Sequence, residues 1–414
     1  MAVNKKKLIN DPVHGFITIH SELVFDIIQH PYFQRLRRIK QLGLTEFVYP
    51  GALHTRFHHA LGAMHLMSTA ISTLKGKGIK ISDKECEASM VAILLHDIGH
   101  GPFSHALEPA ILHDTPHEAM SAHIMQVLNN EFKGKLNLAI KIFNNTYERK
   151  FFNQLVSSQL DVDRLDYLMR DSFYTGVHEG QIGAERLIKM LSVVDDQLVV
   201  EEKGIYSIES FLISRRLMYW QVYLHKTVIA AEQMLFKIME RAKELVQQGQ
   251  QIPANPCLCY FLENNVRMAD VEADKEVLEK FISLDDIDIW SAVKVWKNHE
   301  DKVLSLLCGH LLNRRLFKVQ LTGRLPETRQ KMAITAAVIS KYNIAPELAH
   351  YLVISGTISN HAYLSETAIK VCSKNREVVD VASASDLPNI KALTQPVQKH
   401  YLCWPKEAEA ELIN

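Results

Sequence analysis

Two apolar segments with helical periodicity constrain the fold of this chain more than any other feature. Residues 56–75 and 84–98 carry apolar side chains at the three- and four-residue spacing of an α-helix. The second segment contains His96 and Asp97 and then meets the sequence GHGP at residues 99–102, which ends a helix. We therefore expect two packed helices, one of which ends on a polar pair at the edge of the core.

Helical periodicity continues through much of the N-terminal part. It predicts helices at residues 31–41, 117–130, 136–145, 153–171 and 183–194, and a long helix from 208 to 247. Residues 11–15 (DPVHG) predict a turn. Residues 198–200 and 205–208 lie on either side of a charged Glu-Glu-Lys-Gly sequence, which predicts a β-hairpin.

A change of composition divides the chain. Residues 248–256 are rich in Gln, Gly and Pro, and beyond them β-branched runs occur at residues 351–354 and 378–381. The sequence therefore predicts a mainly α protein. Its helical core with a small β-hairpin would occupy residues 1–250, and an α+β region for packing or assembly would occupy residues 251–414.

The composition excludes several classes of protein. Lysine plus arginine and aspartate plus glutamate each number 47, so no global basic field would attract nucleic acid. No window approaches the ~18 apolar residues that span a bilayer, and residues 1–10 lack the apolar run of a signal peptide. The six cysteines are scattered, and the Cys257-x-Cys259 pair lacks a second ligand pair at zinc-site spacing. We expect a cytoplasmic protein that contacts no membrane.

Histidine is concentrated in one part of the chain. Ten of the 20 histidines lie within residues 54–123, and neutral imidazole both binds metals and titrates near physiological pH. Two His-Asp pairs occur there. His113-Asp114 lies in a predicted loop, whereas His96-Asp97 ends an apolar helix, where buried polar groups need a partner. The His96-Asp97 pair is therefore the better candidate for binding a cation.

Two further candidate ligands lie on neighbouring predicted helices. His59, with His58 as an alternative, lies on the preceding helix, and Asp163 lies in the acidic run at residues 161–171. Two histidines and two carboxylates would leave metal positions open for water and substrate. Any one histidine could equally be a hydrogen-bonded core residue, so the interpretation depends on the whole set. The expected cofactor is a divalent metal ion, Fe, Mn, Zn, Ni, Co or Mg.

Five sequence motifs follow one another along residues 7–245. They are LINDPVHG at 8–15, FQRLRRIKQLG at 33–43, TRFHHALG at 55–62, LHDIGHGPFSH at 95–105 and the acidic run at 161–171. Together they resemble the HD-domain phosphohydrolases, and most closely the deoxynucleoside triphosphate triphosphohydrolase branch, which includes the animal SAM-and-HD-domain dNTPases. The resemblance implies an HD-domain helical core. It also implies metal-assisted attack of water on the α-phosphorus of a dNTP, which gives deoxynucleoside and inorganic triphosphate.

The same resemblance assigns roles to individual residues. The metal would be held by His59, His96, Asp97 and Asp163. The substrate would meet Gln41, Leu42, Arg56, Arg164, Tyr167, Asp171, Arg215, Tyr219 and Tyr223. The catalytic group would comprise His117, His105, His100 and Arg56, with His117 or His105 protonating the departing 5′ oxygen. Two alternatives stay open: His100 could only cap the glycine-rich turn, and the Tyr/Arg face at residues 215–226 could be a helix-packing surface.

Some positions depart from the pattern of the animal proteins. Gln29 stands where an acidic residue reads a guanine activator, and Glu201 replaces a phosphate-contacting arginine, although Lys7, Arg37 and Lys203 match. Tyr219 replaces a histidine of the substrate pocket. The metal and catalytic set is therefore intact, whereas activation by a nucleotide is left open.

Three functions are compatible with these observations. The first is a dNTP triphosphohydrolase that assembles as a homo-oligomer, a dimer or tetramer, with or without a nucleotide activator. The second is a phosphohydrolase of another phosphoester, such as a nucleoside monophosphate or cyclic nucleotide. The third is a non-catalytic nucleotide sensor, which would have no need of an open metal position.

Overall fold

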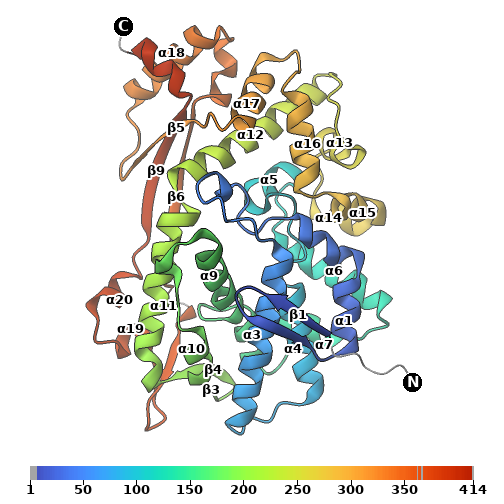
Figure 1. Cartoon of the computed structure of the whole chain (residues 1–414), viewed down its shortest axis with the longest axis vertical. Coiled ribbons are helices and arrows are strands. Elements are labelled where there is room, and N and C mark those ends of the chain that lie inside the picture. Colours follow the sequence, from blue (N-terminus) through green and yellow to red (C-terminus); the bar gives the residue numbers. More distant parts are fainter. Residues whose placement is uncertain (1–6, 361, 365–366, 413–414) are drawn as a thin grey trace.

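The computed structural model describes residues 7–360, 362–364 and 367–412, and it is mainly helical (Figure 1). The fold class predicted from the sequence is confirmed, with an HD-type helical core and an α+β C-terminal region. Residues 1–6, which carry part of the prediction about a signal peptide, lie outside the described residues.

The helices of the first 250 residues build the core. They are α1 (Glu22–Gln29), α2 (Pro31–Gln34), α3 (Arg56–Gly76), α4 (Asp83–Leu95), α5 (Glu108–Ile111), α6 (His117–Glu131), α7 (Asn137–Phe143), α8 (Phe151–Val156), α9 (Val162–Thr175), α10 (Ala184–Met190), α11 (Ile205–Met218) and α12 (Lys226–Gln247). Helices α3, α4 and α9 lie in the middle of this part, and α3 packs against both of the others (Figure 1).

The two helices expected at 56–75 and 84–98 are present with nearly the predicted ends. Helix α4 begins at a capping box, in which Ser82 accepts from the Glu85 backbone and Glu85 accepts from the Ser82 backbone. It ends one residue before His96, so the His-Asp pair follows the last helical turn. The apolar faces of α3 and α4 thus fix where His59 and His96 lie.

The predicted β-hairpin is wrong in its second strand. The observed hairpin joins β3 (Leu191–Val194) to β4 (Gln197–Glu201), with Val194 opposite Gln197. The two residues between them, Asp195 and Asp196, have φ angles of 48° and 61°, as a tight two-residue turn requires. Residues 205–208, expected as the second strand, instead begin α11.

Four predicted helices are interrupted or end early, and the one expected at 183–194 ends at Met190 because β3 begins at Leu191. The helix expected at 208–247 is divided into α11 and α12 by a π-helical turn at Tyr219–Tyr223. The helix expected at 153–171 is divided into α8 and α9, because the Asp161 side chain accepts from the Arg164 backbone N–H and starts a new helix. The helix expected at 31–41 continues beyond α2 only as a 3₁₀ turn, Arg35–Arg38.

The C-terminal region combines helices with strands. Its helices are α13 (Pro256–Glu263), α14 (Met268–Ala273), α15 (Lys275–Ser283), α16 (Asp286–Trp296), α17 (Lys302–Leu312), α18 (Thr328–Tyr342), α19 (Val381–Ala384) and α20 (Pro388–Ala392). Its strands are β5 (Lys318–Thr322), β6 (Ile354–Asn360), β7 (Lys370–Cys372), β8 (Val378–Asp380) and β9 (Val397–Trp404).

The sheets connect this region to the core. Strand β9 lies between β5 and β6 in an antiparallel sheet, beside α12 in Figure 1. Strand β7 pairs parallel to β4, so the core hairpin and β7–β8 form one four-stranded sheet. At the other end of the core, β1 (Lys7–Asp11) and β2 (Gly15–Ile19) form a hairpin around the turn expected at 11–15. The boundary near residue 250 stays a prediction.

Across the described part of the chain, the helices are too short or too polar to cross a membrane.

Candidate active site

The structure brings His59, His96 and Asp163 together from three different elements. Their candidate ligand atoms all lie within 4.8 Å of one another. The Nε2 atom of His59 lies 3.1 Å from Asp163 Oδ1 and 3.4 Å from Nε2 of His96, which is itself 3.5 Å from Asp163 Oδ1. Both histidines are buried, whereas the Asp163 side chain is 23% exposed. The cluster is therefore open to solvent on the side of the carboxylate.

Asp97 lies against the same cluster. Its Oδ1 atom is 3.3 Å from His96 Nε2, and its Oδ2 atom is 3.8 Å from His59 Nε2. Oδ2 also accepts a hydrogen bond from Arg56 Nη1, while Arg56 Nε donates to Ser104 Oγ at 2.8 Å. Arg56, expected to bind phosphate, is thus engaged with Asp97 and Ser104.

The alternatives to these ligands lie elsewhere. His58 caps the start of α3, where its Nδ1 accepts from the Thr55 backbone N–H at 3.2 Å. The second His-Asp pair is exposed, with 52% of the His113 side chain and 82% of the Asp114 side chain accessible. His113 and Asp114 therefore serve as matched controls for the buried His96-Asp97 pair.

A buried ionic network holds His59 in place. The Nδ1 atom of His59 lies 2.8 Å from Asp166 Oδ2, which also accepts from Arg170 Nε at 2.9 Å. His14 Nε2 lies 2.6 Å from Asp166 Oδ1, and Arg170 Nη1 donates to Asp11 at 2.8 Å. A carboxylate on the outer nitrogen of a metal-binding histidine fixes its tautomer and orientation.

Asp166 lies in the acidic run at residues 161–171, but sequence reasoning did not find this network. A local signal exists in the i, i+4 spacing of Asp166 and Arg170. Gly62 is a second signal, because a Cβ atom there would lie 2.0 Å from Asp166 Oδ1 and 2.2 Å from Arg170 Nη2. Only glycine lets α3 approach the ion pair this closely.

The carboxylates favour a positive charge at the cluster. Burial alone would lower the pKa of His59, but hydrogen bonds to Asp163 and Asp166 outweigh it and raise that pKa to about 10. Desolvation would raise the pKa of Asp163, yet the hydrogen bonds from His59 and His96 hold it well below its usual value. A divalent cation would take the place of the proton shared by these groups, so the donor set fits a metal ion.

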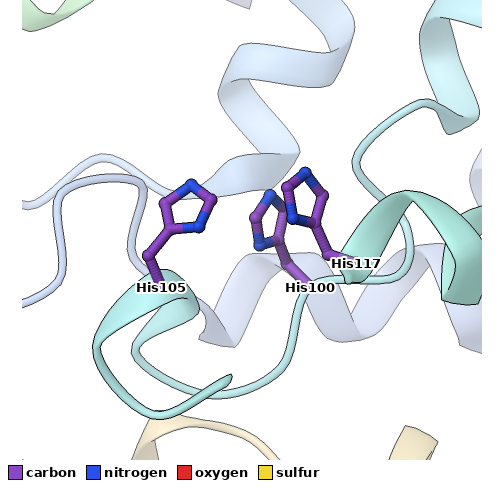
Figure 2. Close-up of side chains that lie close together, drawn as sticks. All are labelled: His100, His105 and His117. Atoms are coloured by element: carbon purple, nitrogen blue, oxygen red, sulfur yellow. The ribbon is translucent and has the colours of Figure 1, made fainter. Parts of the chain in front are cut away.

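A second group of histidines lies next to Asp97. His100 follows α4, His105 lies on the 3₁₀ turn Ser104–Ala106, and His117 begins α6 (Figure 2). The rings of His100 and His117 stack at 3.7 Å, and His105 meets both at about 5 Å between centroids. His100 Nε2 is 3.4 Å from Asp97 Oδ1. The three predicted catalytic histidines are thus brought together beside the first cluster.

Glu108 joins two of these histidines, and sequence reasoning missed it. Its carboxylate oxygens lie 3.2 Å from His105 Nδ1 and 3.3 Å from His117 Nδ1. Glycine at position 99 permits the approach of α6, because a Cβ atom there would lie 2.3 Å from the His117 carbonyl oxygen. Buried Arg35, also missed, donates to the His100 carbonyl at 2.6 Å and holds the loop.

Two arginines keep buried side-chain nitrogens without a hydrogen-bond partner. Among the described residues, Arg164 Nε and both Nε and Nη1 of Arg215 are buried without a hydrogen-bond partner. Arg164 follows Asp163 in α9, its Nη1 forms an ion pair with Asp161, and Arg164, Arg215 and Asp163 all lie near the partly buried Tyr167. Unpaired buried donors are costly, so this arrangement suits an anionic ligand.

The remaining predicted substrate residues surround these arginines or support them. Tyr223 donates to Asp171 Oδ2 at 2.7 Å, and His54 binds the other Asp171 oxygen at 2.7 Å, so Asp171 positions Tyr223. Tyr219 meets Tyr223 edge-on at 5.2 Å and lies 5.9 Å from the Arg215 guanidinium.

The two predicted sugar contacts lie before α3. Gln41 keeps a buried side-chain oxygen that finds no partner among the described residues, and its neighbour Leu42 is partly buried against the core. An unpaired acceptor of this kind can bind a hydroxyl group of a ligand.

Metal binding should raise thermal stability through His59, His96 and Asp163. At Mn²⁺ concentrations about 100 times Kd, we expect stabilisation of about 2.7 kcal/mol, read as a higher Tm by differential scanning fluorimetry and reversed by a chelator. Asp163→Ala should remove this increase, whereas Asp114→Asn at the exposed pair should keep it. An equal increase in Asp163→Ala would show that the ion stabilises the protein elsewhere.

Comparisons with known proteins identify the family of the chain. A family model described as HD domain matches residues 56–170, and one described as HD associated region matches residues 182–253. The chain resembles a phosphohydrolase from Bacteroides thetaiotaomicron, with a TM-score of 0.93, 51% identity and coverage of 97% of this chain and 100% of that one. Uncharacterized protein YwfO of Bacillus subtilis is 36% identical over 76% of this chain and 72% of its own length.

A more distant relative carries a named activity. The deoxynucleoside triphosphate triphosphohydrolase SAMHD1 homolog of Dictyostelium discoideum is 32% identical over 59% of this chain, a match that covers 51% of the relative.

A helical core that unites His59, the His96-Asp97 pair and Asp163 provides a candidate His/Asp metal site of the kind expected in an HD-domain phosphohydrolase. The chain belongs to the HD-domain phosphohydrolases and carries the HD-associated region.

Proposed function

We propose that this protein hydrolyses deoxynucleoside triphosphates to deoxynucleoside and inorganic triphosphate. The observation that carries the proposal is that Arg164 Nε and the Nε and Nη1 atoms of Arg215 are buried without a hydrogen-bond partner, while both arginines and Asp163 lie near Tyr167. A phosphate chain would satisfy those donors and neutralise the charge of Arg215, whereas Arg164 already forms an ion pair with Asp161. The name of the SAMHD1 relative supports the same substrate class.

His59, His96, Asp97 and Asp163 would hold the divalent metal. When bound, such an ion lowers the pKa of a coordinated water and stabilises charge on a phosphoryl oxygen. Arg56 binds Asp97 and holds this carboxylate against His96. Asp166 orients His59 by a hydrogen bond to Nδ1, the ring nitrogen that faces away from His96 and Asp163.

The histidine group would supply the proton to the departing 5′ oxygen. Burial lowers the pKa of His100, and the charge of Arg56 lowers it further, so His100 stays neutral. His105 and His117 each face a Glu108 oxygen through Nδ1, and Nε2 of His117 also lies 3.5 Å from Glu118. We propose that His117 or His105 is the proton donor, as in general acid catalysis elsewhere.

The pocket for the sugar and base would be formed by Gln41, Leu42, Tyr167, Tyr219 and Tyr223. The unpaired Gln41 oxygen offers an acceptor for a sugar hydroxyl. The Tyr219 and Tyr223 rings, held edge-on to each other by the π-helical turn, offer apolar contact.

The charges around Glu201 support activity without a guanine nucleotide. The Glu201 carboxylate pairs with Lys77 at 2.6 Å and with Lys203 at 2.7 Å. Lys203, a position that the resemblance gives to an activating nucleotide, therefore already shares a carboxylate with Lys77. We propose a homo-oligomer, dimer or tetramer, whose activity persists when GTP is left out of the assay.

Arg215→Ala should lower kcat/KM for dNTPs by roughly 10- to 150-fold, because hydrogen bonds to charged groups contribute about 1.5–3 kcal/mol each. Steady-state kinetics measures the change, and Arg216→Ala on the same helix, where the side chain is half-buried, is the control. Equal loss in both variants would contradict a specific phosphate contact at Arg215.

A substrate panel tests the reaction class. The metal-loaded protein is incubated with dNTPs, NTPs, deoxynucleoside monophosphates and cyclic nucleotides, and nucleoside release is followed by chromatography. Turnover of dNTPs is expected. Turnover confined to monophosphates or cyclic nucleotides would replace the proposal with a different phosphoester hydrolase.

A further inference from the structure

Three imidazoles from separate elements converge next to the first metal cluster without being part of it. Candidate ligand atoms of His100, His105 and His117 lie within 4.8 Å of one another (Figure 2). His100 follows Gly99, and His117 begins the helix that packs closely against Gly99. His105 lies on a turn with its side chain exposed. General acid catalysis needs one imidazole, so the convergence of three calls for a further explanation.

Glu108 prepares two of these imidazoles for metal binding. Its two carboxylate oxygens face Nδ1 of His105 and Nδ1 of His117, at 3.2 and 3.3 Å, and one of them also accepts from the His117 backbone N–H at 2.5 Å. An N–H at Nδ1 leaves the lone pair on Nε2, as in the carboxylate–histidine–metal arrangement. Desolvation does not prevent Glu108 from being ionised, because the hydrogen bonds from His105 and His117 hold its pKa well below the usual value.

The local charge favours a cation. The groups that face the three rings are Glu108, Glu118 at 3.5 Å from His117 Nε2, and Asp97 at 3.4 Å from His100 Nε2. Arg56 is the opposing charge, and it is paired with Asp97.

The distances fit a small adjustment around a tetrahedral ion. Metal–nitrogen bonds of about 2.0–2.1 Å place tetrahedral ligand atoms about 3.4 Å apart. The ligand atoms now lie within 4.8 Å of one another. The His105 side chain is 70% exposed, so it can shift to bring its nitrogen to the shorter separation. Three imidazoles suit zinc-class ions, whereas Mg²⁺ and Ca²⁺ prefer oxygen ligands.

We propose that His100, His105 and His117 form a second metal site, which takes Zn²⁺ or a similar borderline ion and is supported by Glu108. Ion binding there occupies the imidazoles that would otherwise donate a proton, so Zn²⁺ inhibits hydrolysis. The binding site stands independently, whereas the inhibition depends on the proposed function.

The experiment measures Zn²⁺ binding by the full chain in a background that lacks the first site, His96→Ala with Asp163→Ala. Isothermal titration calorimetry should find one Zn²⁺ per chain in this background. Glu108→Gln should weaken that binding about 10- to 100-fold, the usual effect of losing an outer carboxylate, and His105→Ala should weaken it at least as much. The exposed His113→Ala is the matched control and should leave binding unchanged.

His105→Ala should also weaken Zn²⁺ binding in a chain that keeps His96 and Asp163. This second measurement does not depend on how well the His96→Ala, Asp163→Ala double variant folds. Zinc content measured by mass spectrometry should fall by one ion per chain in His105→Ala. The proposal is overturned if the background takes up no Zn²⁺, or if binding survives both His105→Ala and Glu108→Gln. Zinc that occupies this site without slowing a Mn²⁺-supported reaction would overturn the inhibitory role.

Discussion

Asp163→Ala is expected to lower kcat for dNTP hydrolysis by roughly 10³-fold or more, because a bound metal contributes several kcal/mol to charge stabilisation in the transition state and each 1.36 kcal/mol is tenfold in rate. Asp163 approaches both His59 and His96, at 3.1 and 3.5 Å. Its removal takes away one of the two carboxylates, with Asp97, that lie against both imidazoles. His96→Ala should have an effect of the same order.

The control for this loss is the second His-Asp pair. His113→Ala and Asp114→Asn alter exposed side chains and should leave kcat within about twofold, since surface changes are usually neutral. Metal content should fall in Asp163→Ala and stay constant in the controls. Full activity in Asp163→Ala with a depleted metal would contradict a role for this cluster in the reaction.

Arg170→Ala is expected to destabilise the metal-free protein by about 3–5 kcal/mol, because removal of one member of a buried ion pair leaves its partners uncompensated. Arg170 is fully buried and donates to Asp166 at 2.9 Å and to Asp11 at 2.8 Å. Urea denaturation of the apoprotein measures the change in the free energy of unfolding. Metal-free conditions separate this effect from any change in metal affinity.

Arg186→Ala serves as the matched control. Its side chain lies on the surface and makes one long hydrogen bond, 3.4 Å, to the Lys203 carbonyl. The expected change is below about 0.5 kcal/mol. If both variants unfold at the same urea concentration, the Asp11–Arg170–Asp166 network does not contribute to stability as the geometry implies.

The sequence predicts those parts of the fold that depend on local periodicity. Helices α3 and α4 follow from apolar spacing and from breakers at their ends, so the positions of His59 and His96 could be derived. The π-helical turn at Tyr219–Tyr223 could not, because its residues fit a continuous helix equally well. The hairpin was misassigned because its turn is Asp195-Asp196, whose positive φ angles have no strong sequence signature.

The candidate site divides in a similar way. The residues that would hold the metal are histidines and aspartates, which can be recognised in the sequence as metal ligands. They lie on or next to predicted helices, and the packing of those helices brings them together. The supporting residues do not reveal themselves, because their partners are far away in the sequence. Asp11 reaches Arg170 across 159 positions and His14 reaches Asp166 across 152. Glu108 binds His117 only because a turn and a glycine bring α6 next to α5.

The central claim is tested most directly by the product formed from a dNTP. Manganese-loaded protein is incubated with each of the four dNTPs, with and without GTP, and the products are resolved by ion-exchange chromatography beside Asp163→Ala and His113→Ala. The account predicts deoxynucleoside and intact inorganic triphosphate in equal amounts, lost in Asp163→Ala and kept in His113→Ala. Orthophosphate or pyrophosphate as the first product, or no product under any of these conditions, would contradict it.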